Sequence, residues 1–76
     1  MNLTKWPFDI PSQVLNALEE RMINCECVDN IRIARSGDSD SIQQYELQRA
    51  HGCCGYVDEE IHVDGLLWFY GFNHGH

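Results

Sequence analysis

The strongest structural signal in the sequence is the pair Asp64-Gly65, which separates two short apolar segments. Asp-Gly favours the two-residue turn whose backbone twist matches that of two paired antiparallel strands. The sequence therefore predicts a β-hairpin with strands Glu59–Val63 and Leu66–Phe72.

The predicted hairpin has two different faces, because successive side chains of a strand point to opposite sides. The first face is apolar and suits the packing of a helix; it carries Ile61, Val63, Leu66, Trp68 and Tyr70. The second face carries Leu67 and Phe69 beside polar side chains. One helix covers only one face, so either the N-terminal Trp6 and Phe8 fold over the second face or it is a surface for a partner or a second copy.

Apolar residues spaced four apart predict one amphipathic helix over Pro11–Ile23. The period then changes to two, which predicts a strand over residues 25–33 with a bulge or break near Val28–Asn30.

A turn-forming cluster at residues 36–41 precedes a second predicted strand, Ile42–Ala50, with Tyr45 and Leu47 on one face. The expected fold is α+β, in a single small domain over residues 1–76. It has one N-terminal helix packed on a mainly antiparallel sheet of about four strands.

Charge narrows the classes of partner. The 76 residues include twelve acidic and five basic side chains, a formal net charge of −7. This argues against direct binding of nucleic acid and suits a basic protein or ribonucleoprotein. No apolar run is long enough for a membrane helix, and the first residues lack a basic secretory signal, so we expect a cytoplasmic protein with reduced thiols.

Two clusters contain metal-ligating residues: Cys25-x-Cys27, and His51-x-Cys53-Cys54. Zinc in proteins takes four thiolate and imidazole ligands, so one alternative is a zinc-stapled binding module. The main expectation is no cofactor and free thiols, because one intervening residue is a short spacing for a zinc pair and cysteine also packs as a small hydrophobe. A thiol–imidazole enzyme is the least favoured reading, and no catalytic residue is predicted.

An acidic run leads into the hairpin, beside the second face with its aromatic side chain. Carboxylates next to aromatic residues are typical of a surface that binds a basic protein. The predicted partner-binding residues are Tyr56, Asp58, Glu59, Glu60, Leu67 and Phe69. Simple solubility is the alternative explanation for the charge.

The segments Gly52–Glu60 (GCCGYVDEE) and Gly71–His76 (GFNHGH) resemble short uncharacterised proteins of bacteriophages and related mobile elements. The resemblance covers the C-terminal third of the chain. It implies an accessory protein in the cytoplasm of a bacterial host, from a pool that includes anti-CRISPR and other counter-defence inhibitors. Such a protein would block a nucleic-acid-handling complex by occlusion or by imitating nucleic acid.

Overall fold

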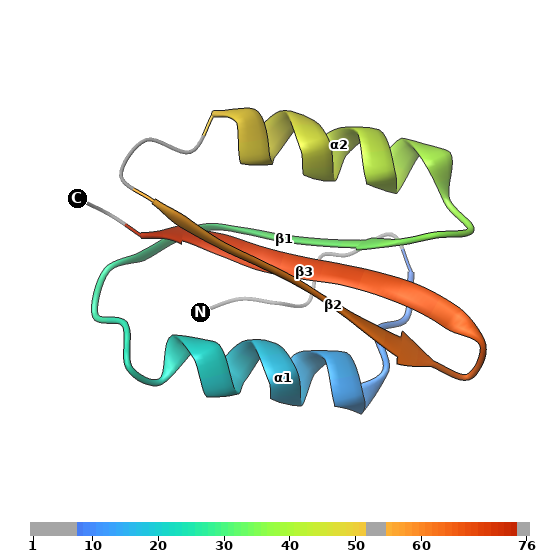
Figure 1. Cartoon of the computed structure of the whole chain (residues 1–76), viewed down its shortest axis with the longest axis horizontal. Coiled ribbons are helices and arrows are strands. Elements are labelled where there is room, and N and C mark those ends of the chain that lie inside the picture. Colours follow the sequence, from blue (N-terminus) through green and yellow to red (C-terminus); the bar gives the residue numbers. More distant parts are fainter. Residues whose placement is uncertain (1–7, 52–54, 75–76) are drawn as a thin grey trace.

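The computed structural model describes residues 8–51 and 55–74. The elements follow one another as α1 (Ser12–Met22), β1 (Val28–Arg35), α2 (Ser39–Ala50), β2 (Tyr56–Val63) and β3 (Leu66–His74). The three strands form one antiparallel sheet in the order β1-β3-β2, and the two helices lie on its opposite faces (Figure 1). The α+β prediction is confirmed, but within the described residues the sheet has three strands instead of about four, and there are two helices instead of one.

The first helix confirms the prediction from its apolar spacing. Val14, Leu18 and Met22 are one turn apart, and all three are buried. They pack against the sheet residues Ile33, Val63, Trp68, Tyr70 and Phe72, which together with them form the main core.

The hairpin is also confirmed, in the predicted register. Val63 pairs with Leu66 and Ile61 pairs with Trp68 across the turn at Asp64-Gly65. Both turn residues have positive φ, 52° and 83°, as the Asp-Gly signal requires. The two strands are longer than predicted at the ends away from the turn.

The strand predicted over residues 25–33 is shifted toward the C-terminus, because the two cysteines lie in the loop before β1. The bulge predicted near Val28–Asn30 is confirmed. The register with β3 shifts between Asp29 and Arg32, and Asn30 has a φ of 50°.

The strand predicted over Ile42–Ala50 is wrong, because this segment is the helix α2. Asp38 caps the helix by accepting a hydrogen bond from the backbone N–H of Ser41, and the glutamines and Arg49 that follow have good helix propensity. Tyr45 faces the sheet, whereas Leu47 is 60% exposed, so the two do not share a face.

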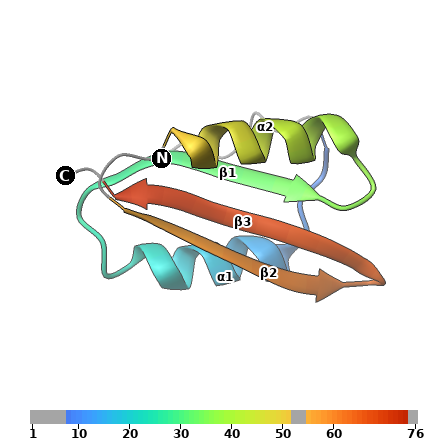
Figure 2. The same cartoon turned by 45° about the horizontal axis from the view of Figure 1, so that its top comes forward.

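α2 covers only part of the second face of the sheet. It packs on β1, while α1 packs on β2 and β3 from the other side (Figure 2). The Tyr45 ring lies 6.0 Å from that of Phe69. One of the two alternatives for this face was a cover formed by Trp6 and Phe8. The Phe8 ring packs on Trp68, a residue of the first face, at 5.5 Å and on Arg35. Trp6 lies outside the described residues.

Candidate functional site

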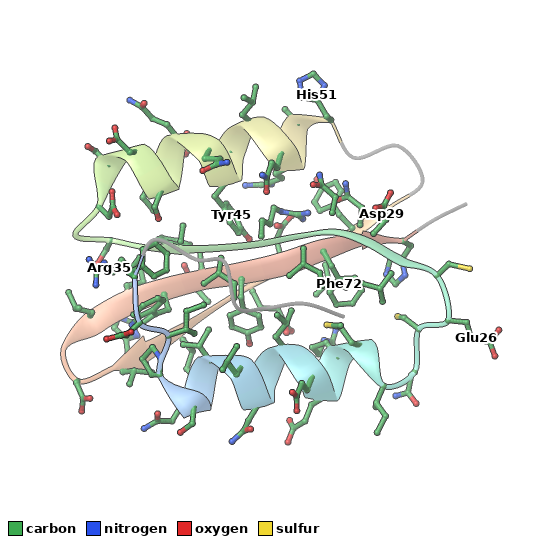
Figure 3. The ribbon with its side chains drawn as sticks, turned by 180° about the vertical axis from the view of Figure 1, so that it is seen from behind. Glu26, Asp29, Arg35, Tyr45, His51 and Phe72 are labelled. Atoms are coloured by element: carbon green, nitrogen blue, oxygen red, sulfur yellow. The ribbon has the colours of Figure 1, made fainter. Side chains whose placement is uncertain are left out.

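Asp58 of β2 is the centre of a polar cluster between the sheet and α2. Its Oδ1 accepts hydrogen bonds from Arg32 Nη2 at 2.7 Å, from Arg32 Nε at 3.2 Å and from the Tyr45 hydroxyl at 2.6 Å. Arg49 Nε lies 3.2 Å from Oδ2 without the alignment of a hydrogen bond. Figure 3 shows Tyr45 projecting from α2 toward the sheet. Two cations and one hydroxyl therefore converge on a single carboxylate.

Arg32 is the most deeply buried charge of the described chain, with 1% of the residue exposed. Its Nη1 donates to Asn73 Oδ1 at 2.8 Å and its Nη2 to the carbonyl oxygen of Val57 at 3.2 Å. The rings of Tyr45 and Tyr56 lie 5.4 and 5.8 Å from its Cζ. These contacts satisfy the buried charge and join β1 to both other strands of the sheet and to Tyr45 of α2.

Gly71 of β3 makes room for this cluster. The sheet register places Arg32 and Asp58 on either side of it. A Cβ at this position would overlap the carbonyl oxygen of Val57 and lie 3.0 Å from Asp58 Oδ1. The close approach of backbone and carboxylate therefore requires glycine.

Burial and the hydrogen bond to Asp58 raise the pKa of Tyr45 well above its ordinary value of 10.0. The folded protein thus favours the neutral phenol. A group whose pKa is raised on folding contributes stability that is complete below its unfolded-state pKa and is lost as the pH rises above it.

We expect the free energy of unfolding to fall as the pH rises above about 10, and to fall less steeply in Tyr45→Phe, which has no phenol at this position. At neutral pH the variant loses a charge-assisted hydrogen bond, a cost of about 1.5–3 kcal/mol. Urea unfolding of both proteins across a pH series measures the two effects. If the free energy of unfolding changed with pH in the same way in both proteins, the raised pKa of Tyr45 would be contradicted.

The six predicted partner-binding residues do not form one free surface. Asp58 is held in the cluster, and Glu59 lies on the α1 side, where it pairs with Arg21 at 3.2 Å and accepts a hydrogen bond from the Tyr70 hydroxyl. The other four share the α2 side, where Glu60 and Tyr56 are exposed and Leu67 and Phe69 are half-buried. Of these four, Glu60 and Phe69 border an open groove of about 300 Å³ between α2 and the hairpin, whose other lining residues are Tyr45, Arg49, Asp58 and Glu59.

The predicted metal ligands are only partly described. Cys27 is exposed in the loop after α1, Cys25 is half-buried with its Sγ 3.7 Å from the carbonyl oxygen of Arg21, and His51 is exposed at the end of α2. Figure 3 shows His51 and Glu26, which lies between the two cysteines, at the same end of the molecule but beside different layers.

Cys53 and Cys54 lie outside the described residues, and within residues 8–51 and 55–74 no metal-ligating side chains form a cluster of three. The zinc alternative and the thiol–imidazole alternative therefore stay predictions.

The arginines are distributed very unevenly among the carboxylates. All twelve acidic residues lie in the described part of the chain, and only Asp58 and Glu59 pair with arginines there. These two carboxylates hold three of the four described arginines, Arg21, Arg32 and Arg49. The ten other acidic side chains make no ion pair with any described residue, and nine of them are exposed.

Comparisons with protein-family models, with curated proteins and with solved structures found no match. Neither helix in the described part of the chain has the length and apolar character needed to cross a membrane.

Proposed function

We propose that this protein is a small acidic binding protein that docks on a basic surface of a nucleic-acid-handling protein or ribonucleoprotein of a bacterial cell and blocks it by occlusion or by imitating nucleic acid. The most specific form of the proposal is a counter-defence inhibitor of the anti-CRISPR type, which is what the C-terminal resemblance implies. The protein has a binding role in this proposal and no catalytic one.

One observation carries the proposal. Ten carboxylates have no arginine partner in the described chain, whereas three arginines form ion pairs with only two carboxylates. Arg32 is buried, and Arg21 and Arg49 are half-exposed beside their partners. The outer surface therefore carries more unpaired negative charge than it would if the arginines were spread among all the carboxylates. Such a surface attracts a basic partner and steers its approach.

The unpaired carboxylates lie in every layer of the molecule. Glu19 and Glu20 are exposed on α1, Asp40 and Glu46 on α2, and Glu60 on β2. A carboxylate on a solvated surface keeps its charge at neutral pH, as the phosphate of nucleic acid does. Carboxylates distributed over all layers favour a protein that competes electrostatically with nucleic acid over an enzyme with its acidic residues in one active site.

The proposal is tested by affinity capture from a bacterial lysate with the wild type and with a variant in which Glu19, Glu20, Asp40 and Glu46 are replaced by their amides. These side chains are exposed and outside the polar cluster, so the variant keeps the fold. We expect the wild type to retain a nucleic-acid-binding protein that added DNA releases and that the variant does not retain. Retention should weaken with salt, because the Debye length shrinks from about 8 Å at physiological ionic strength to about 3 Å at 1 M.

Equal capture by the two proteins, or capture that DNA does not affect, would contradict the proposal. The matched control replaces four exposed neutral side chains, Gln13, Asn16, Gln43 and Gln44, by alanine, which leaves the net charge unchanged. This control should capture the same protein as the wild type.

A further inference from the structure

The two outer edges of the sheet differ in regularity. β1 and β2 each pair only with the central strand β3 among the described residues. β1 is interrupted by the bulge at Asn30, whereas β2 pairs with β3 without a break from Tyr56 to Val63. β2 lies at the border of the sheet away from β1 (Figure 2), so its outer edge is regular and has no partner strand among the described residues. An edge of this kind is a template for the addition of another strand.

The backbone groups that β2 directs outward can be assigned. In an antiparallel pair, every second residue exchanges hydrogen bonds with the partner strand and the residues between direct their N–H and C=O groups away. The N–H of His74 donates to the carbonyl oxygen of Gly55 at 3.1 Å, directly before β2. Counting from Gly55, the outward groups are those of Tyr56, Asp58, Glu60 and His62.

Charge selects the occupant of this edge. A second copy paired antiparallel about Glu60, an outward residue near the middle of β2, would place Glu60 opposite Glu60 of its partner. Like charges directly opposite each other destabilise a strand pair, whereas opposite charges stabilise it. Glu60 is exposed and makes no ion pair with any described residue. An added strand with lysine or arginine opposite Glu60 is therefore favoured over a second copy.

We propose that the outer edge of β2 binds an extended basic segment of the partner as a fourth strand of the sheet. The inference rests on the proposed function, for which it names the docking edge and the form of the segment. Backbone hydrogen bonds along Asp58, Glu60 and His62 supply the register, and cross-strand pairing with Glu60 selects a cation.

The probe for this proposal is a synthetic octapeptide of alternating lysine and valine, with alternating glutamate and valine as its control. Hydrogen exchange of the isotopically labelled protein is followed by NMR with and without the peptide. At a concentration about ten times the Kd of the lysine peptide, we expect the amides of Glu60 and His62 to exchange about tenfold more slowly. The glutamate peptide should have no effect.

A proline variant tests the backbone contribution separately from charge. His62→Pro removes one outward N–H and no carboxylate, and edge strands accept proline where the N–H faces solvent. We expect it to bind the lysine peptide roughly tenfold more weakly than His62→Ala does, which corresponds to about one backbone hydrogen bond. Circular dichroism verifies that both variants are folded, and the exchange measurement on the wild type stands if the proline variant is not.

A second pair of variants tests the charge. Glu60→Gln should weaken binding of the lysine peptide more than Glu19→Gln, which removes the same charge from an exposed site on α1. Peptide binding with unchanged exchange at Glu60 and His62, and equal affinities of the two variants at position 62, would overturn the edge proposal and leave the electrostatic function standing. Failure of the wild type to bind any polycation would overturn both.

Discussion

Replacing Arg32 with methionine is expected to lower the free energy of unfolding by about 3–5 kcal/mol. The substitution leaves Asp58 beneath α2 without its main cation and removes the donors that satisfy Asn73 and the Val57 carbonyl. Typical stabilities of about 0.05–0.15 kcal/mol per residue give a protein of this length roughly 4–11 kcal/mol in total. Urea unfolding should therefore show a large decrease in the midpoint.

Two comparisons isolate the cause. Arg21→Met removes an exposed partner of Glu59 and should cost less than about 1 kcal/mol. The double variant Arg32→Met/Asp58→Asn should recover part of the loss, because no unpaired charge is then buried. A cost for Arg32→Met that matches the cost for Arg21→Met would show that the buried cluster does not hold the layers together.

The second large effect is expected from Gly71→Ala, with a loss of about 3 kcal/mol. The new methyl group would overlap the Val57 carbonyl oxygen of the neighbouring strand, and neither strand can move without disturbing Asp58. For a domain of this size the loss corresponds to a decrease in Tm on the order of 10–20 °C. Thermal unfolding followed by circular dichroism measures it.

The matched control is Gly37→Ala in the loop before α2. Its added Cβ would have no neighbour closer than Leu66 Cδ2 at 4.0 Å, which is an ordinary contact. This variant should stay within about 0.5 kcal/mol of the wild type. If Gly71→Ala and Gly37→Ala have the same Tm, close packing at Gly71 is not important for stability.

The parts of the fold that depend on local patterns were predictable from the sequence. Val14, Leu18 and Met22 form one stripe at helical spacing, and Asp64-Gly65 between apolar segments determines both the turn and the register of the hairpin. In each case one face is strongly apolar, so a change of period or register would expose the core.

The helix α2 was not predictable from hydrophobic periodicity because it has almost no apolar stripe. Only Ser41 and Tyr45 are buried on it, since the helix lies over a polar cluster instead of a hydrophobic core. The available signals were Asp38 as an N-cap and the run of good helix formers that follows. Tyr45 and Leu47 also match the two-residue period of a strand, and this match favours the wrong element.

The candidate site was predictable in its acidic character but not in its pairing. Arg32 alternates with Ile31 and Ile33, and this pattern correctly places it on the opposite face. α2 covers this opposite face of the sheet. The burial of Arg32 and its ion pair with Asp58 therefore depend on tertiary structure and not on a local sequence pattern. Glu60 and Tyr56 are exposed, whereas Asp58 and Glu59 are engaged within the protein, so the partner-binding surface stays a prediction.

The strand order β1-β3-β2 has a consequence for the order in which the protein can fold during synthesis. Among the three described strands β3 leaves the ribosome last, yet it is the one that pairs with both of the others. Until the residues of β3 emerge, β1 has no strand to pair with, and Arg32 lacks both its partner Asn73 and the space that Gly71 leaves. The buried face of α1 also lacks Trp68, Tyr70 and Phe72 to pack against. The nascent chain can form its helices early, but its sheet assembles in one late step that closes contacts between distant parts of the sequence.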